Sequence, residues 1–110
     1  MKNYDIGWLG EIKAAHYLRR QGMHILARRY RGGRGEIDLI AKDGDTLVFV
    51  EVKARPQGHI GDGARAVTAE KRARLRSAAE HYLLSHPWKS VRFDVVEISA
   101  AGLRHIKHAF

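Results

Sequence analysis

The stretch GEIDLIAKDGDTLVFVEVK, residues 35–53, decides the fold. It contains two apolar runs rich in β-branched side chains, separated by the turn Lys42-Asp43-Gly44-Asp45. Asp-Gly between two such runs is the strongest short signal for a β-hairpin. A two-residue loop at Asp43-Gly44 predicts four cross-strand pairs, namely Lys42 with Asp45, Ile40 with Leu47, Asp38 with Phe49 and Glu36 with Glu51. We therefore expect an antiparallel hairpin at the centre of the protein.

The alternation of side chains along this hairpin gathers four charged residues on one face. Successive residues of a strand point to opposite faces of a sheet. The charged face should hold Glu36, Asp38, Glu51 and Lys53, and the opposite, apolar face Ile37, Leu39, Val48, Val50 and Val52. Like charges placed across a pair of strands destabilise it. Three carboxylates beside one ammonium therefore predict a bound cation and a functional site.

The whole chain is short, basic and free of cysteine. Its 110 residues predict one compact domain, residues 1–110. The 20 lysines and arginines exceed the 12 acidic residues, and the net charge of +8 attracts polyanions, nucleic acid first and anionic membranes second. The sequence has no run of about 18 apolar residues and no signal-peptide core, so we expect a cytoplasmic protein outside the membrane. Without cysteine, neither a disulfide nor a thiolate zinc site can form.

Residues 4–21 are predicted to form an amphipathic helix that carries one acid within its apolar stripe. That stripe consists of Tyr4, Trp8, Ile12, Ala15 and Leu18. Gly22 is the expected residue after the helix end. Glu11 falls inside the stripe, where a carboxylate is costly unless something pairs with it. Two interpretations stay open: Glu11 pairs with an arginine at the edge of the stripe, or it contributes to a site on the neighbouring sheet.

A basic segment lies between this helix and the hairpin. Residues 23–31 predict a first strand of mixed polarity, which suits the edge of a sheet, and residues 31–35 predict a flexible, glycine-rich loop. Six arginines and no acid lie between Arg19 and Arg34. Such a run is usually a solvated surface, but here it leads directly into the carboxylate hairpin. Binding of phosphate groups is therefore an equally good interpretation.

A glycine-rich stretch and a second helix follow the hairpin. Residues 54–67 should form a mobile loop beside the site, in which His59 is a surface residue. Thr68 can cap a helix that runs to about Ser85, and Pro87 stops it. The buried stripe of this helix is predicted to be Leu75, Ala78, Ala79, Tyr82 and Leu83, and its basic first half contains Lys71, Arg72, Arg74 and Arg76.

The end of the chain completes the predicted sheet. Residues 91–98 alternate as a strand, and residues 103–109 predict a shorter and weaker one. The resulting order is α-β-β-β-α-β, with an antiparallel meander followed by a crossover helix. This order predicts an α/β sandwich and not a doubly wound sheet.

The charged face of the hairpin has the chemistry of a divalent-cation site. Hard oxygen ligands, without thiolate or paired histidines, favour Mg²⁺ or Mn²⁺ over zinc. Asp38 and Glu51 are the expected ligands, with the carbonyl of Val52 nearby. Lys53 could polarise an attacking water or neutralise charge on phosphorus, and Glu11 could complete the shell or take a proton. The alternative is a structural hairpin in which Lys53 only pairs with Glu51, a type of contact that is common and worth little.

These residues resemble a known group of enzymes. Asp38 followed by Glu51-Val52-Lys53 resembles the PD-(D/E)XK motif of restriction-endonuclease-like nucleases, and Glu11 in the preceding helix makes the set similar to the archaeal Holliday-junction resolvases. The stretches Gly10-Glu11, GEIDLIA, FVEVKAR and VTAEKRARLRSAAEHYL are similar to the bacterial YraN family. That second resemblance covers nearly the whole chain. One departure from the general motif is Ile37, which stands where a proline commonly precedes the aspartate.

The resemblance implies a fold and a set of roles. The fold is the restriction-endonuclease-like α-β-β-β-α-β sandwich, a central mixed sheet flanked by helices. The metal-site carboxylates would be Glu11, Asp38 and Glu51, which also count with Lys53 as the catalytic residues. The side chains expected to bind nucleic acid are Arg31, Arg34, Arg55, Lys71 and Arg72.

The expected function is that of a metal-dependent nuclease acting on DNA, with branched or recombination intermediates among its candidate substrates. Mg²⁺ or Mn²⁺ is the expected cofactor. By analogy with resolvases, a homodimer is expected, and a helicase or recombination protein is a candidate partner. The alternative is a nucleic-acid-binding module or adaptor that has kept the fold and lost the chemistry. A pure binder gains nothing from a cluster of carboxylates near phosphates, which favours the nuclease.

Overall fold

The strands in the described part of the chain form one five-stranded mixed sheet. The computed structural model describes residues 3–55 and 67–110. Their elements are α1 (Asn3–Arg20), β1 (His24–Gly32), β2 (Gly35–Asp43), β3 (Thr46–Arg55), α3 (Ala69–Ser85), β4 (Ser90–Ser99) and β5 (Gly102–Ile106). The strand order is β1-β2-β3-β4-β5, in which only β3 and β4 run parallel. This confirms the predicted α/β sandwich, the edge position of the first strand and the short last strand. The loop predicted for residues 54–67 begins later than expected, because residues 54 and 55 still belong to β3, and residues 56–66 with His59 lie outside the described residues.

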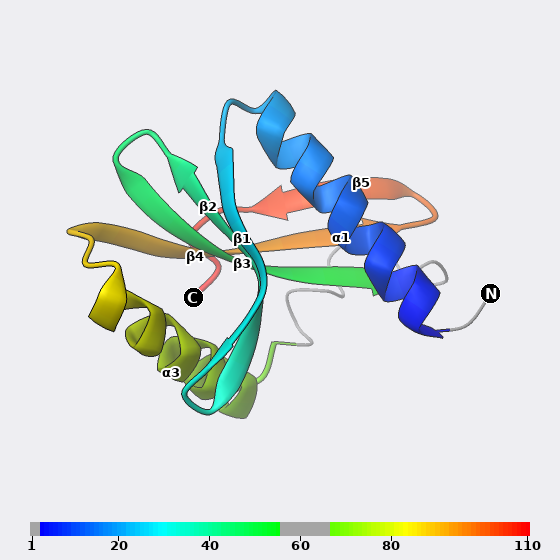
Figure 1. Ribbon diagram of the computed structural model, residues 1–110. Coiled ribbons are helices and arrows are strands. Elements are labelled where there is room, and N and C mark those ends of the chain that lie inside the picture. Colours follow the sequence, from blue (N-terminus) through cyan, green and yellow to red (C-terminus); the bar gives the residue numbers. More distant parts are fainter. Residues whose placement is uncertain (1–2, 56–66) are drawn as a thin grey trace.

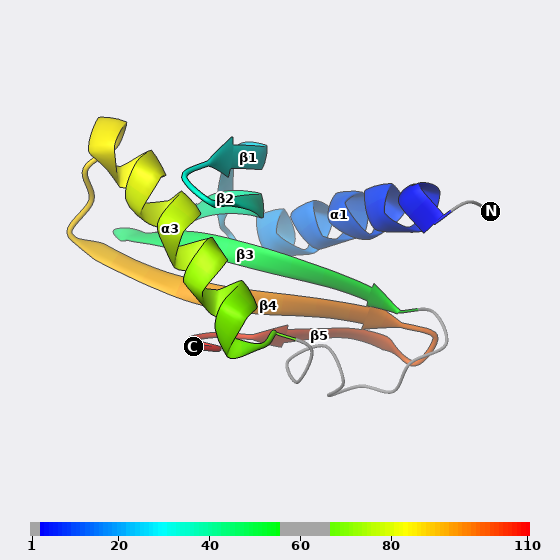
Figure 2. The same cartoon turned by 90° about the horizontal axis from the view of Figure 1, so that it is seen from below.

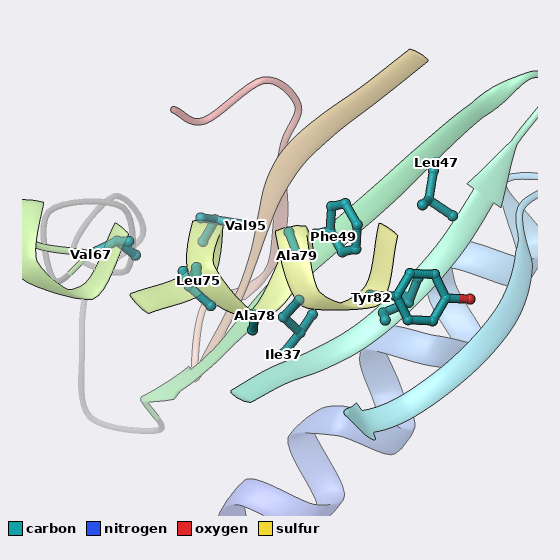
Figure 3. Packing of buried hydrophobic residues seen from close by; sticks show 10 residues of the cluster. Ile37, Leu47, Phe49, Val67, Leu75, Ala78, Ala79, Tyr82 and Val95 are labelled. Atoms are coloured by element: carbon teal, nitrogen blue, oxygen red, sulfur yellow. The ribbon is translucent and has the colours of Figure 1, made fainter. Parts of the chain in front are cut away.

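Helices α1 and α3 cover opposite faces of the sheet (Figures 1 and 2). On one face, α1 packs on a cluster that includes Leu39, Val48 and Val50. On the other, α3 packs on a second cluster, in which Phe49 lies between strand residues and Tyr82 of the helix (Figure 3). Each face of the sheet therefore has its own apolar core.

Helix α1 approaches the sheet through small residues. Ala14, Ala15 and Leu18 are fully buried, and a Cβ atom at Gly10 would lie only 2.7 Å from the Cβ of Ala54 on β3. Ile12 was predicted to be buried, but it is 38% exposed. Ala15 and Leu18 are buried as predicted. In the turn before them, Gly10 and Glu11 take the buried positions in place of Ile12, because the small Gly10 allows close contact with β3.

The β2–β3 hairpin forms with a register that differs from the prediction. Asp43 pairs with Thr46, so that Gly44 and Asp45 make the loop and Ile40 pairs with Phe49 instead of Leu47. The shift equals two residues and therefore leaves the side chains of the paired residues, 39–43 and 46–50, on the faces that were predicted. Asp43 belongs to the strand because its carboxylate is held by Arg92 on β4, at 2.8 Å.

The regular ladder between β2 and β3 ends just before the charged residues. The last pair of the ladder is Leu39 with Val50, and beyond it the N–H of Val52 donates to Oδ2 of Asp38 at 2.8 Å. Beyond this point the expected alternation breaks. Ile37 lies in the cluster under α3 and not on the face of Leu39, as was predicted. A side-chain carboxylate here replaces a backbone partner, which opens the hairpin at Asp38.

The glycine-rich turn between β1 and β2 packs against α3 (Figure 1). A Cβ atom at Gly33 would lie 2.7 Å from Oγ of Ser77, and one at Gly35 would clash with the carbonyl oxygen of Arg74. The N–H of Arg34 also donates to Oγ of Ser77, at 3.0 Å. We predicted a flexible loop, but these glycines instead permit close contact between a turn and a helix.

Candidate functional site

Asp38 on β2 and Glu51 on β3 form a pair of carboxyl groups where the hairpin opens. Glu51 is buried. Burial raises the pKa of Asp38 to about 8, assisted by the negative charge of Glu51 and by a hydrogen bond between the two side chains. The hydrogen bond from the N–H of Val52 lowers this pKa, but it does not compensate. At neutral pH and without a bound cation, Asp38 therefore keeps its proton.

Two lysines contact the same oxygen of Glu51. Nζ of Lys71 lies 3.2 Å from Oε1 of Glu51, and Nζ of Lys53 lies 3.8 Å from it. Burial lowers the pKa of Lys71, and its contacts with Lys53 and Glu51 outweigh that effect and raise it. Lys53 therefore lies beside Glu51, as the hairpin pattern predicted. Lys71, which was predicted only as a phosphate contact, joins the same group from the first turn of α3.

Glu11 reaches the neighbourhood of the pair but is held by Arg29. Nε of Arg29 donates to both carboxylate oxygens of Glu11, at 2.8 and 3.2 Å, and Nη2 lies 2.7 Å from Oε2. This is the arginine pairing that was one of the two interpretations of Glu11. The charge of Glu11 nevertheless contributes to the raised pKa of Asp38.

The described residues offer two carboxylates to a cation, not three. Within residues 3–55 and 67–110, no group of three or more histidine, aspartate or glutamate side chains is arranged to hold a metal ion. Asp38 and Glu51 are the residues that could hold one, with the Val52 carbonyl at the same point of β3. Arg29, which pairs with Glu11, has a positive φ of 50° within an edge strand. That conformation is uncommon for a residue with a side chain and typically marks a functional or strained position.

An open pocket of about 660 Å³ lies over the carboxyl pair. Its wall combines the β1–β2 turn with the first half of α3, and its lining residues are Arg31, Gly33, Arg34, Gly35, Glu36, Asp38, Glu51, Lys71, Arg74 and Leu75. The pocket thus has carboxylates at one point and four cationic side chains around them. Such an arrangement can hold an anion against a cation-binding centre.

Three of the five predicted phosphate-binding residues line this pocket: Arg31, Arg34 and Lys71. Arg72 does not, because its Nε donates to the carbonyl of Val67 and its guanidinium lies over the ring of Phe110. The backbone of Arg55 ends β3, and its side chain lies outside the described residues.

Two further residues belong to the pocket. Arg74 lines it one helical turn after Lys71, a spacing of three that places both side chains on one face of α3. The spacing in the sequence was therefore sufficient to predict that Arg74 lies beside Lys71 in the pocket. Glu36 also lines the pocket and pairs with Arg31 at 3.1 Å, and both side chains are partly exposed.

Comparison with known proteins places the chain in a family. Residues 10–98 match the model described as "Uncharacterised protein family UPF0102". The chain belongs to the UPF0102 family. This confirms the resemblance to YraN-like proteins, and the matched range includes Glu11, Asp38, Glu51 and Lys71.

Members of the UPF0102 family from distant bacteria align with nearly the whole chain. A UPF0102 protein of Dechloromonas aromatica (strain RCB) is 47% identical over 100 residues, which cover 91% of this chain and 83% of the relative. Those of Alkaliphilus oremlandii (strain OhILAs) and Rhodococcus opacus (strain B4) are 41% and 44% identical, and each alignment covers at least 98% of both proteins.

Among the described residues, no helix is both long and apolar enough to cross a membrane.

Proposed function

We propose that this UPF0102 protein hydrolyses phosphodiester bonds of DNA with the help of Mg²⁺ or Mn²⁺. The observation that carries the proposal is the carboxyl pair of Asp38 and Glu51 beneath a pocket with cationic walls. A pair of like charges in a partly buried position is unfavourable, and a divalent cation removes the repulsion. The surrounding cations suit a phosphate group, which carries the opposite charge.

The donor set fits Mg²⁺ or Mn²⁺. Mg²⁺ is usually bound by one or two carboxylates together with waters and substrate phosphate, and it does not need a complete protein cage. Asp38 and Glu51 would hold the ion, with the Val52 carbonyl as a further oxygen donor. Once bound, the ion would supply Lewis-acid activation of the phosphate and of a water molecule. Glu11 remains tied to Arg29 and orients that guanidinium beside the pair.

The residues of the chain have separate tasks in the hydrolysis. Water attacks phosphorus, the bond from phosphorus to one sugar oxygen breaks, and that oxygen takes a proton while the water loses one. The hairpin pattern assigns to Lys53, which lies beside Glu51, the stabilisation of negative charge that develops on the phosphate. The arginines Arg31, Arg34 and Arg74 hold the chain of phosphates at the pocket wall.

A second candidate is a DNA-binding adaptor without catalysis, and the ring of cations by itself would suit it. The carboxyl pair argues against this function, because two acids at the centre of a phosphate-binding surface repel the ligand. A binding protein would be improved by their removal. A nuclease would be inactivated by it.

The test is a cleavage panel with labelled branched, duplex and single-stranded DNA, each incubated with Mg²⁺, Mn²⁺ or EDTA. We expect metal-dependent cleavage by the wild type and none by Asp38→Asn, which keeps the shape of the side chain and removes its ability to ionise and bind the cation. Asp45→Asn is the matched control, because Asp45 is exposed in the β2–β3 turn and should cleave as the wild type does. If Asp38→Asn binds DNA more tightly and the wild type never cleaves, the adaptor function is supported instead.

A further inference from the structure

The two lysines that share Glu51 differ in their access to the pocket. Among the described residues, Lys71 lines the pocket, whereas the lining does not include Lys53. The side chain of Lys71 is 38% exposed and that of Lys53 is 17% exposed. Lys71 is also the closer of the two to Oε1 of Glu51, at 3.2 against 3.8 Å. The lysine that a ligand in the pocket meets is therefore the one on α3.

The first turn of α3 holds Lys71 in a fixed position. Oγ1 of Thr68 accepts a hydrogen bond from the backbone N–H of Lys71 at 3.2 Å, which caps the helix. One turn later, the carbonyl of Arg74 lies against Gly35 of the β1–β2 turn. The helix is thus fixed both at its start and against the opposite wall of the pocket. Only the side chain of Lys71 needs to move to reach a ligand.

We propose that Lys71 is a catalytic residue whose ammonium contacts a non-bridging oxygen of the phosphate that is cleaved. This inference rests on the proposed nuclease function and changes the assignment of its lysines. When a phosphate enters the pocket, it competes with Glu51 for the nearest accessible ammonium, and that ammonium belongs to Lys71. Lys53, more deeply buried, stays beside Glu51 as a positioning residue. A contact that strengthens as charge develops on the phosphate accelerates cleavage.

The first experiment compares single-turnover cleavage rates of four proteins. We expect Lys71→Met to reduce the rate on the order of 10²-fold or more, the size of effect typical of one lost electrostatic contact in the transition state. Methionine keeps most of the length and removes the charge. Lys89→Met is the matched control, since Lys89 is exposed beyond the other end of α3 and should retain the wild-type rate. Lys53→Met completes the set and should also be slower, with DNA affinity close to that of the wild type.

The second experiment detects the contact without cleavage. Lysine side chains are labelled by reductive methylation with ¹³C-formaldehyde, and signals are assigned with the single Lys71→Arg and Lys89→Arg variants. A short single-stranded DNA oligonucleotide is then added in EDTA, which prevents cleavage. The signal of Lys71 should shift and that of Lys89 should not. An unchanged Lys71 signal at saturating oligonucleotide overturns the inference.

The outcomes separate this inference from the function on which it rests. A wild type that cleaves no DNA in the panel removes the proposed function, and the role of Lys71 with it. A wild type that cleaves, together with a Lys71→Met protein that cleaves equally fast, removes only the role of Lys71. Loss of rate in Lys71→Met with an unchanged melting temperature and a shifted Lys71 signal supports both.

Discussion

Two aspartates of the same sheet show how burial changes the pKa of a carboxyl group when hydrogen-bond donors surround it and when they do not. Asp94 on β4 is completely buried, and burial alone would raise its pKa, but hydrogen bonds from His105 and Arg92 lower it below the ordinary value. Asp38 on β2 is half-buried, and its pKa rises to about 8 because burial and the negative charge of Glu51 both favour the protonated form, and the hydrogen bond from Val52 does not offset them. The same side chain thus acquires opposite properties.

The partners of the two aspartates explain the difference. Asp94 receives Nε2 of His105 at 2.7 Å, Nε of Arg92 at 3.0 Å and the N–H of His108 at 3.2 Å. Asp38 receives one backbone N–H, from Val52. A buried carboxylate with a full set of hydrogen-bond donors has a structural role. A carboxyl group that lies beside another acid in a pocket is instead suited to bind a cation.

The largest expected effect is a decrease in the free energy of unfolding when Asp94 is replaced. Asp94→Ala leaves Arg92 and His105 buried without their shared partner, and breaking a buried ion pair in this way typically costs about 3–5 kcal/mol. Urea unfolding should show this decrease in the free energy of unfolding. Asp45→Ala, at an exposed position, is the control and should change it by less than about 0.5 kcal/mol. A loss below about 1 kcal/mol at Asp94 would show that the network does not stabilise the fold.

The next effect concerns binding of a cation at Asp38. A ligand that binds only the folded state stabilises it by about 2.7 kcal/mol at a concentration 100 times its Kd. Mn²⁺ should therefore raise the melting temperature of the wild type and of Asp45→Asn, but not that of Asp38→Asn. Calorimetric titration provides the corresponding Kd. Equal stabilisation of all three proteins would place the ion elsewhere.

A third effect is the pH dependence of stability in the absence of metal. The folded state binds a proton at Asp38 up to about pH 8, whereas the unfolded chain releases it near pH 4. The free energy of unfolding should therefore fall as pH rises between these values, by at most about 1.4 kcal/mol per pH unit for this group. Subtracting the curve of Asp38→Asn from that of the wild type isolates the contribution. A difference that rises with pH, or stays flat, would contradict the raised pKa.

The smallest effect should come from the third acid of the pocket. Glu36 pairs with Arg31, and both side chains are partly exposed, at 38% and 83%. Exposed pairs contribute roughly 0–1 kcal/mol, so Glu36→Gln should hardly change stability. It should also leave Mn²⁺ binding intact. If Glu36→Gln abolished Mn²⁺ binding, as Asp38→Asn is expected to do, the cation site would have to include Glu36 as a third acid.

Local sequence patterns predicted the elements of this fold well. Thr68 caps α3, Gly22 follows α1 with a positive φ of 92°, and the β2–β3 hairpin turns at Gly44. Each of these features depends on residues within a few positions of one another. The hairpin register could not be decided in the same way, because either loop satisfies the turn residues. The deciding contact is that of Asp43 with Arg92, which is 49 residues away.

The errors at the site have the same origin. The sequence pattern placed Asp38, Glu51 and Lys53 together because alternation along a hairpin is local. It could not show that Lys71 would contact Glu51 or that Arg29 would hold Glu11, because both contacts join separate elements. Ile37 lies on the other face where the regular β2–β3 ladder has ended, and alternation along the sequence does not predict where a ladder ends. A glycine-rich sequence, finally, does not distinguish a flexible loop from a turn that packs tightly on a helix.

The open β2–β3 turn makes the protein convenient for spectroscopy. A Cβ atom at Gly44 would meet nothing within 4 Å, and the neighbouring Asp45 is exposed. Because the chain has no cysteine, Asp45→Cys would give a single thiol for attaching a fluorophore or spin label. The indole N–H of Trp88 donates to the backbone carbonyl of Asp45 at 2.8 Å, so a fluorophore there would have a natural quencher beside it. Such a label would report encounters with DNA from a position outside the lining of the proposed site.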